Sequence, residues 1–451
     1  MNEIILGNQQ KEALDLILKF KDSKEICFTL KGYAGCGKTM LTKYLIDELD
    51  KNWENYTICA PTHKAKIVIE RFTGKEGFTL HKLLSLSPNI QIMDLDLNDL
   101  KFLIPKKSQL FPMNSLIICD EASMVNDFLY DLMVDRCQKN NCKIVWICDE
   151  AQIKPVNSIA LSKVFQVENS YQLTEIFRQK EGSALADLLF KNRTEFIESF
   201  NTSLSKHGSI YVSSQPKDFL KNSLENFKIG IDNKDIMETK VLSYTNERVN
   251  IFNNTIHKHL LGDKEYFIGE FLTCYDSFEF NYSQFWNGMD YIVTEEPIEK
   301  SIYIPNVGEF PGYELTVYDT LENQNVSFNV LSKSLSYKEI QRITGMIETI
   351  RLDAIEAKKF KSRQSKDLWM MYYQMMNSFT TPVDMYHDNR LVRKKTFDYG
   401  YAITLHKSQG SSINNTFIDM RSIGMCRDEL EKRQLQYVAL SRTRNNVNIL
   451  Q

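Results

Sequence analysis

The sequence lacks the segments that would place it in or across a membrane. None of its 451 residues belongs to a run approaching the roughly 20 apolar residues that a membrane-spanning helix needs. Residues 1–10 also lack a charged start followed by an apolar run, the pattern of a secretory signal. We therefore expect a cytoplasmic protein with no membrane partner.

The nine cysteines lack the spacing of a disulfide framework or a zinc site. Cys137 and Cys142 have no second pair and no nearby histidine. Several others, such as Cys27 and Cys119, lie inside apolar runs, where a free thiol packs as a small apolar side chain. The pattern predicts reduced cysteines in the core, in agreement with a cytoplasmic location.

An excess of positive charge is also missing. The formal net charge is −3, whereas a protein that only coats nucleic acid is usually basic overall. Any grip on nucleic acid must therefore come from local groups of side chains. The composition, 43% hydrophobic and 25% charged, is that of a folded globular protein, and the length predicts about three domains.

The order of apolar runs predicts two α/β domains with insertions. Short apolar runs at residues 26–30, 56–60, 115–119 and 143–148 are separated by helical lengths, which is typical of a parallel sheet covered on both faces. Short alternating segments from about 269 to 331 predict a small antiparallel barrel, and residues 336–379 have a helical pattern. We expect these domains: 1–180 (first α/β domain), 85–112 (inserted hairpin), 181–268 (second α/β domain, first part), 269–390 (barrel and helical insertion) and 391–451 (second α/β domain, second part).

A phosphate-binding loop follows the first apolar run and opens a helix, the context that its chemistry requires. Its glycines let backbone N–H groups converge on phosphates at the positive end of a helix. Lys38 is expected to reach the β- and γ-phosphates, and Thr39 to bind Mg²⁺. The loop residues are Gly32, Tyr33, Ala34, Gly35, Cys36, Gly37, Lys38 and Thr39. This loop predicts binding of a nucleoside triphosphate.

Two later strands end in polar residues suited to hydrolysis. Asp120 follows a buried run and is expected to hold Mg²⁺, and Glu121 is expected to activate water as the general base. Taken alone, this acidic pair would be interpreted as a solvated strand end. Gln152 follows the next strand, where an uncharged amide can sense the γ-phosphate; alone, it would be interpreted as part of a polar loop.

In their order along the chain, these motifs resemble the superfamily-one helicases of the RecD-like, Dda-like class. Besides Gln10, the phosphate loop and the Gln152 loop, the motifs are residues 60–65, 79–82, 120–124, 173–179, 244–246, 404–410 and 437–444. They span nearly the whole chain. The motifs at 404–410 and 437–444 are highly specific as a pair, and their presence argues against a nucleotide kinase.

The resemblance implies a fold of two RecA-like P-loop domains with ATP between them. It implies a pin hairpin inserted in the first domain and an SH3-like β-barrel with a helical insertion in the second. Arg178 and Arg442 would place guanidinium groups on the γ-phosphate, Gln10 would contact adenine, and Gly410 would line the ATP site. In one departure, Lys154 stands where the family often has proline.

The resemblance also implies a path for single-stranded DNA over both domains. Hydroxyls, amides and a few cations suit a phosphodiester backbone that is bound without sequence preference. The expected contacts are Pro61, Thr62, His63, Lys64 and His81 on the first domain, and Tyr244, Asn246, Thr404, His406 and Lys407 on the second.

Three further groups of residues have open interpretations. Arg390, Arg393, Lys394 and Lys395 form either a local positive potential beside the DNA or a solvated face. Phe102 is the candidate for the pin residue that wedges the duplex, although an apolar residue in a short hairpin is often part of its own small core. Trp286, Tyr291 and Tyr303 are expected in the barrel core rather than on a DNA surface.

The resulting hypothesis is an ATP- and Mg²⁺-dependent helicase that translocates 5′ to 3′ on single-stranded DNA. The resemblance implies a monomer that acts in replication, recombination or repair in a bacterial or phage-infected cytoplasm. Its partners would be single-stranded DNA and single/double-strand junctions, with a single-strand-binding protein or replisome components as further candidates. The alternatives are an ATP-dependent nucleic-acid clamp and a motor that moves on RNA.

Overall fold

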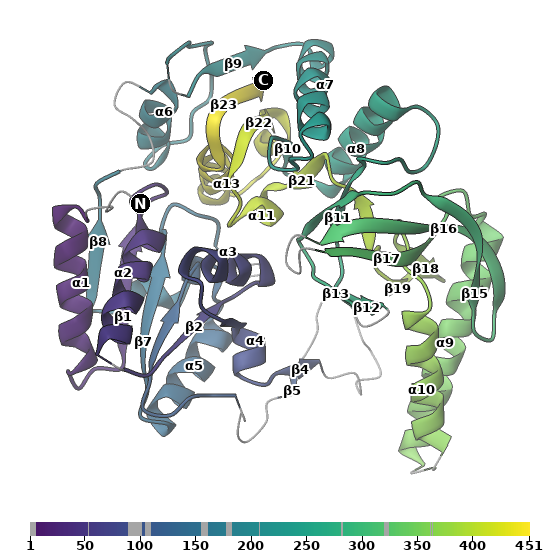
Figure 1. The fold of residues 1–451 in the computed structure, drawn as a ribbon, viewed down its shortest axis with the longest axis horizontal. Helices are drawn as coiled ribbons and strands as arrows, with labels where there is room; N and C mark the ends of the chain where they lie inside the picture. Colours follow the sequence, from purple (N-terminus) through teal and green to yellow (C-terminus); the bar gives the residue numbers. More distant parts are fainter. Residues whose placement is uncertain are drawn as a thin grey trace.

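The computed structural model describes residues 6–52, 54–88, 102–103, 110–154, 161–176, 183–206, 208–280, 283–319, 324–360, 362 and 364–451. Two α/β domains and an antiparallel barrel surround a common centre, and a pair of long helices projects from the barrel side (Figure 1). Within the described ranges, no helix is both long and apolar enough to cross a membrane.

The first α/β domain is a six-stranded parallel sheet in the order β3-β2-β6-β7-β1-β8. Its central strands are almost continuously buried, as expected for a sheet that is covered on both faces. They are β1 (Cys27–Gly32), β2 (Tyr56–Ala60), β3 (Gly77–Thr79), β6 (Leu116–Cys119), β7 (Lys143–Cys148) and β8 (Ser170–Leu173). The predicted parallel sheet is therefore confirmed.

Helices cover both faces of this sheet. One apolar cluster joins it to α1 (Asn8–Lys21), α2 (Lys38–Lys51) and α3 (His63–Thr73). The cluster on the other face includes α4 (Leu80–Leu83) and α5 (Asp127–Lys139). Two short 3₁₀ helices, η1 (Ala122–Met124) and η2 (Lys163–Gln166), complete this domain. The loops at the carboxyl ends of β1, β6 and β7 are thereby fixed on a rigid support.

The second α/β domain is a five-stranded parallel sheet in the order β21-β10-β22-β23-β9. The strands are β9 (Ile210–Ser213), β10 (Thr239–Ser243), β21 (Ala402–Thr404), β22 (Ile413–Asp419) and β23 (Thr443–Leu450). Its helices are α6 (Ala184–Asn192), α7 (Pro216–Asp232), α8 (Asn246–Leu261), α11 (Leu405–Ser408), α12 (Met420–Gly424) and α13 (Glu429–Ser441). The apolar cluster that packs α7 and α8 against this sheet continues into the barrel. The second α/β domain and the barrel therefore share one core.

The antiparallel sheet between the two parts of this domain fits the predicted SH3-like insertion. Its order is β15-β16-β14-β11-β20, with β17 also pairing with β16. The strands are β11 (Phe271–Cys274), β14 (Asp290–Val293), β15 (Ile298–Ile304), β16 (Gly308–Asp319), β17 (Gln324–Leu331) and β20 (Phe397–Tyr399), beside the hairpin of β12 (Phe278–Phe280) and β13 (Ser283–Phe285). Because β20 pairs with β11, this part of the chain completes the barrel before the parallel sheet resumes at β21.

The prediction of the barrel core is right for one aromatic residue of three. Tyr291 is 2% exposed and lies in the core. Tyr303 is 63% exposed, so its prediction was wrong: it lies between the buried Ile302 and Ile304, where strand alternation turns its side chain outward. Trp286 was also predicted wrongly, because it is only partly buried and stacks on another domain.

A helical hairpin and a small β-hairpin complete the insertion. The predicted helical segment forms α9 (Tyr337–Lys359) and α10 (Gln364–Asn377), which pack along each other and project from the barrel (Figure 1). Ser336 begins α9 with a capping box, exchanging hydrogen bonds with Glu339. The hairpin β18 (Met385–His387) and β19 (Arg390–Arg393) packs against α9.

The inserted hairpin expected at residues 85–112 is described only in part. β4 (Ser87–Pro88) pairs antiparallel with β5 (Phe102–Leu103). Residues 89–101 and 104–109, and the side chain of Phe102, lie outside the described part of the chain. The pin role of Phe102 remains a prediction.

Candidate nucleotide and nucleic-acid sites

The phosphate loop joins the end of β1 to the start of α2. Gly35 and Gly37 have φ angles of 86° and 78°, in the left-handed region that side chains with a Cβ rarely adopt. Gly37 precedes Lys38 as the N-cap residue of α2. The loop thus turns sharply and presents its backbone at a helix N-terminus, which is the arrangement that binds phosphate groups.

Lys38 is held inside the loop by carbonyl groups and a carboxylate. Its ammonium group donates to Gly32 O at 2.6 Å and to Tyr33 O at 3.1 Å, and its Nζ lies 3.9 Å from Asp149 Oδ2. Burial favours its neutral form, but nearby acidic groups, Asp149 first, outweigh burial and raise its pKa. Lys38 is therefore a charged group ready to bind an anion in the loop.

The predicted catalytic carboxylates follow β6. Asp120 is 7% exposed, and burial, followed by the charge of Glu121, raises its pKa to about 7. Such a carboxylate favours a nearby cation. Glu121 has a φ angle of 51°, which is uncommon for a residue with a side chain and often occurs at functional sites. Thr39 and Asp120 line the same cavity, and their oxygens are the ligands that Mg²⁺ prefers.

Asp149 is a functional candidate that the sequence analysis did not single out. It is fully buried after β7, and its carboxylate accepts hydrogen bonds from the Ala151 N–H and the Tyr437 hydroxyl. Burial raises its pKa, and Lys38 partly opposes that shift. The acidic residues after β7 in Cys148-Asp149-Glu150 repeat the pattern after β6, which was the available signal.

The two predicted glutamines both line the cavity at the phosphate loop. Gln152 is 3% exposed, and its Oε1 is buried without a hydrogen-bond partner among the described residues. A free buried acceptor fits an incoming water or hydroxyl donor. Gln10 accepts from Gly7 N and donates to Cys36 O and Gly37 O. Through these hydrogen bonds Gln10 stabilises the phosphate loop. Its contact with adenine remains a prediction.

A cavity of about 460 Å³ opens between the two α/β domains at this site. The second domain contributes Gly410 and Arg442, and Arg442 is 5% exposed with its guanidinium group donating to Ser441 Oγ. The first domain contributes Gln10, Ala34, Gly35, Gly37, Lys38, Thr39, Asp120, Glu121 and Gln152. Arg178 lies outside the described residues.

Tyr437, Arg193 and Lys154 each connect the two domains beside this cavity. The Tyr437 hydroxyl accepts from Ala34 N at 2.9 Å and donates to Asp149 at 3.2 Å. Arg193 lies over the ring of Tyr33, 4.1 Å from its centroid. The third contact involves the unusual Lys154, whose ammonium group lies 2.8 Å from Asp428 Oδ2. A change in the position of the phosphate loop would therefore alter contacts with the second domain directly.

On the first domain, the expected DNA residues lie at the start of α3 and α4. Pro61 and Thr62 are half-buried, and Thr62 caps α3 by accepting from Ala65 N. His63 stacks on Trp286 of the barrel, with ring centroids 4.0 Å apart. Burial lowers the pKa of His63 to about 4 and also lowers the pKa values of Lys64 and His81. His63 is therefore neutral at pH 7 and contributes a ring face rather than a charge.

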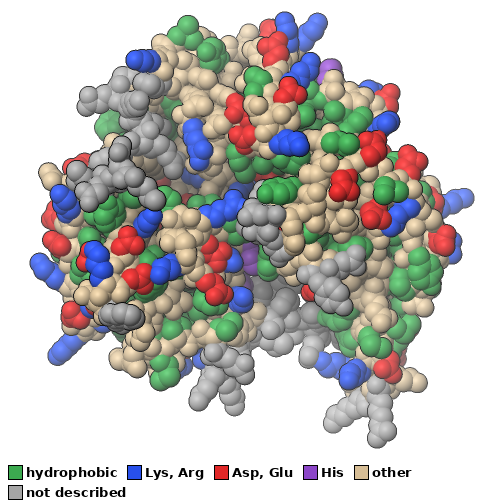
Figure 2. Space-filling model, in the orientation of Figure 1, with side chains coloured by type: hydrophobic (Ala, Val, Ile, Leu, Met, Phe, Trp, Pro, Cys, Tyr) green, Lys and Arg blue, Asp and Glu red, His purple; other side chains and the backbone are tan. Residues whose placement is uncertain are grey.

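On the second domain, the expected DNA residues lie at the carboxyl ends of β10 and β21. Thr404 caps α11 by accepting from Lys407 N, and Asn246 begins α8. The rings of Tyr244 and His406 lie 6.3 Å apart. Lys407 lies over the ring of Tyr275, and burial, then the charge of Lys395, lower its pKa, with a smaller contribution from the charge of Lys64 on the first domain. A histidine and Lys or Arg side chains gather at the centre of one face of the molecule (Figure 2).

In the basic cluster before β20, Arg393 is buried and the other three members are partly buried. Arg393 is 5% exposed and donates to Met376 O and Phe379 O. It is therefore neither part of a solvated face nor a source of positive potential beside the DNA. Arg390 pairs with Glu348 on α9. Lys394 and Lys395 line a second cavity, discussed below.

Comparisons with known proteins agree with this geometry. Residues 5–215 match the AAA domain family, and residues 399–450 match the UvrD-like helicase C-terminal domain. The ATP-dependent DNA helicase Dda of Enterobacteria phage T4 is 25% identical over 472 residues, which cover 98% of both chains. The RecBCD enzyme subunit RecD of Buchnera aphidicola is 21% identical over 429 residues, 90% of this chain and 63% of that protein.

Solved structures of Pif1 helicases share the fold. The Candida albicans protein has a TM-score of 0.52 at 16% identity, covering 99% of this chain and 94% of that one. A Bacteroides protein in complex with ADP-AlF3 and single-stranded DNA has a TM-score of 0.52 at 18% identity, covering 99% and 92%. The similarity to superfamily-one helicases, and within them to the Dda-like class, extends over nearly the whole chain.

The shared fold explains why residues far apart in the sequence meet at one cavity. It brings the phosphate loop and helix α13 together across two sheets. The contacts of Trp286 and Asp149 were not visible in the sequence, because each depends on a neighbour from a distant segment.

Proposed function

We propose that this chain is an ATP-driven motor that travels 5′ to 3′ on single-stranded DNA and separates duplexes. One observation carries the proposal: the phosphate-loop cavity is lined from both α/β domains, by Lys38 of the first and Arg442 of the second. A nucleotide bound there would couple hydrolysis to relative movement of the domains. The relative named an ATP-dependent DNA helicase and the Pif1 complex with single-stranded DNA support DNA as the track.

The hydrolytic step follows from the charges around the cavity. Lys38 and Arg442 would stabilise the negative charge that develops on the transferred phosphoryl group, and Glu121 would accept the proton of the attacking water. Gln152 has a free acceptor with which to orient that water. Mg²⁺, held by Thr39 and Asp120, would neutralise charge on the β- and γ-phosphates. Arg178 is proposed as a second arginine at the γ-phosphate.

Movement would come from alternating grip by the two sets of DNA residues. Tyr437 contacts both the phosphate loop and Asp149, so loss of the γ-phosphate would change the contact between the domains. Lys64 and His63 would hold the strand on the first domain, and Thr404 and Lys407 on the second. A cycle in which one set releases while the other holds moves the strand in one direction.

ATP hydrolysis with different polymers separates this proposal from its alternatives. We expect turnover with MgATP to rise at least about tenfold on adding single-stranded DNA, because a translocating ATPase hydrolyses ATP mainly while it is bound to its strand. The measurement is steady-state phosphate release with DNA, with RNA of matched sequence and with no polymer. Stimulation by RNA alone would indicate an RNA motor, and binding to DNA without stimulation would indicate a clamp.

Replacing Phe102 by Ala is expected to slow unwinding several-fold and to spare DNA-stimulated ATP hydrolysis. The proposed pin needs an apolar surface against the last base pair, whereas the ATP cavity lies in the α/β domains. Both rates should be measured on the same forked substrate, with Leu103→Ala as the neighbouring control on β5. An unchanged unwinding rate would remove Phe102 from the pin role.

A further inference from the structure

A second cavity, of about 1180 Å³, lies where the second α/β domain meets the barrel and the β18–β19 hairpin. Its lining carries five cations and two carboxylates, a formal excess of three positive charges. They are Lys333, Arg390, Lys394, Lys395, Lys407, Asp384 and Asp398. In a chain whose net charge is −3, this concentration of cations marks a local attraction for an anion.

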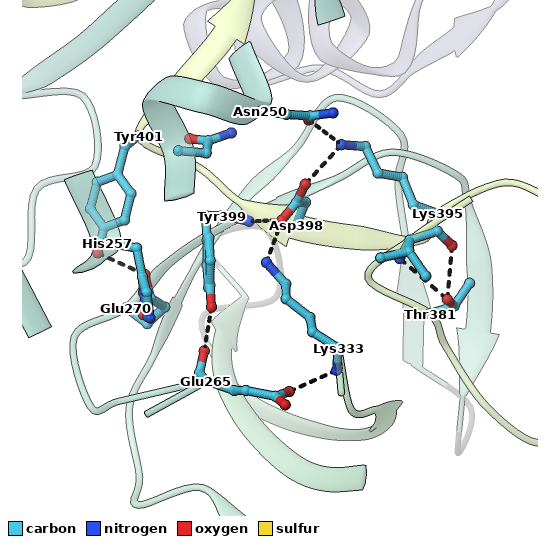
Figure 3. Close-up of polar contacts among 12 residues, drawn as sticks. Asn250, His257, Glu265, Glu270, Lys333, Thr381, Lys395, Asp398, Tyr399 and Tyr401 are labelled. Atoms are coloured by element: carbon cyan, nitrogen blue, oxygen red, sulfur yellow. Dashed lines mark hydrogen bonds and ion pairs between the residues drawn. The ribbon is translucent and has the colours of Figure 1, made fainter. Parts of the chain in front are cut away.

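One carboxylate of the cavity is already engaged in positioning two of its lysines. Asp398 Oδ1 accepts from Lys333 Nζ at 2.9 Å, and its Oδ2 accepts from Lys395 Nζ at 2.8 Å (Figure 3). Burial opposes the charge of Asp398, but the two lysines outweigh it and lower its pKa. Asn250 also accepts from Lys395 at 3.0 Å. Lys395 is thus held in one orientation, which reduces the entropy that binding an anion would cost.

Lys407 lines the same cavity, and it forms no ion pair with a carboxylate in the described part of the chain. Lys407 Nζ lies 3.6 Å from the centroid of the Tyr275 ring, and Lys395 Nζ lies 4.1 Å from it. Burial, and then the charge of Lys395, lower the pKa of Lys407 to about 8. The Tyr275 hydroxyl is buried and has no hydrogen-bond partner among the described residues. An anion here would relieve the repulsion between the lysines, and its oxygens would accept from the hydroxyl.

The lining of the cavity also carries amides. Asn246, Asn250 and Asn254 recur every four residues on one face of α8, and all three line the cavity. Amide groups bind phosphate and base atoms without selecting a sequence. Asn246 and Lys407 also belong to the residues proposed above to hold DNA, so the cavity continues the expected DNA path.

We propose that this cavity binds phosphodiester groups of the single strand, extending its path beyond Lys407 along α8 to Lys394 and Lys395. A polynucleotide fits better than one small anion, because the cavity is far larger than a phosphate ion and its cations come from separate segments of the chain. Asp398 is the positioning residue for Lys395 and Lys333. The inference deepens the proposed function and rests on it.

The salt dependence of DNA binding tests the proposal with cavity variants. For single strands, each phosphate contact contributes about 0.7 to the slope of log K against log salt concentration. We expect Lys394→Gln and Lys395→Gln each to reduce the slope by about 0.7 and the double variant by about 1.4. Each single substitution should weaken binding by about tenfold at low salt, the usual effect of losing a hydrogen bond to a charged group. The measurement is fluorescence anisotropy with an oligothymidylate.

Two further variants distinguish contact from general charge or misfolding. Lys395→Arg keeps the cation and should keep the slope of the parent protein. Lys258→Gln lies on the same α8 helix with its side chain 72% exposed, outside the cavity, and should change neither slope nor affinity. Thermal unfolding should show that each variant folds.

Three outcomes would count against this proposal or its basis. Slopes that stay at the parent value in well-folded Lys394 and Lys395 variants would overturn the cavity as a strand site. A change seen only with a blunt duplex would assign the cavity to double-stranded DNA and overturn the single-strand assignment. If the parent protein bound no single-stranded DNA at all, the proposed function itself would fail.

Discussion

Replacing Lys38 by Ala is expected to lower ATP turnover by at least about 10³-fold and to leave single-stranded DNA binding within about threefold. Lys38 is the cation inside the phosphate loop, and stabilisation of developing charge is usually the largest contribution to catalysis. The proposed DNA residues lie on other loops, so their grip should persist. The measurements are steady-state hydrolysis and anisotropy with a labelled oligonucleotide.

Lys43→Ala provides the matched control for Lys38→Ala. Lys43 lies on the same helix, α2, with an exposed side chain outside the ATP cavity. It should retain parental turnover. Loss of Lys38 also leaves the buried Asp149 without its cation, so thermal unfolding must be measured for each variant. Loss of DNA binding together with turnover in a folded Lys38→Ala protein would show that the site assignment is wrong.

Replacing Arg442 by Ala is expected to lower kcat by about 10³-fold while ATP affinity falls by no more than about tenfold. Arginine fingers supply about 10³- to 10⁵-fold in phosphoryl transfer, because they act mainly on charge in the transition state. Arg442 belongs to the second α/β domain but lines the cavity of the first. Loss of the Arg442 side chain should therefore also uncouple the relative movement of the two α/β domains from hydrolysis. Single-turnover hydrolysis and nucleotide titration give the two quantities separately.

Two substitutions sharpen the test of Arg442. Arg442→Lys keeps one positive charge but loses the planar pair of donors, so its kcat should stay well below the parental value. Arg444→Ala, two residues further along, removes an exposed arginine outside the cavity and should have little effect on kcat. A kcat near the parental value in Arg442→Ala would exclude this residue from the transition state and weaken the case for a motor.

The parallel sheets could be predicted from the sequence because their signal is local. Runs such as Tyr56–Ala60 and Lys143–Cys148 are mostly apolar, and the structure forms strands with those bounds. The phosphate loop was equally clear, because its glycines and lysine follow a strand at fixed spacing. In both cases the chemistry lies within a few neighbouring residues.

Contacts between distant segments could not be predicted in the same way. Asp149 gains its role from Lys38 and Tyr437, which stand more than a hundred residues away on either side. Arg393 resembled a solvated cation, yet two carbonyl groups at the end of α10 satisfy its guanidinium group inside the protein. Composition alone cannot distinguish such a buried arginine from an exposed one.

The resemblance to a family supplied roles that residue chemistry alone left open. The interpretation of His63 as a residue on the DNA path rather than in the core came from its motif. The structure adds that its ring already stacks on Trp286 of the barrel. Lys154, the departure from the family pattern, has a partner of its own in Asp428, and its place in the loop is maintained.

The most direct test of the motor is the unwinding of matched duplexes with either a 5′ or a 3′ single-stranded tail. The reaction contains MgATP and a trap strand that captures displaced DNA, and a Lys38→Ala control shows dependence on hydrolysis. We predict that the 5′-tailed duplex opens and that the 3′-tailed duplex does not. Opening of the 3′-tailed duplex alone would contradict the proposed direction, and opening of neither would contradict the helicase assignment.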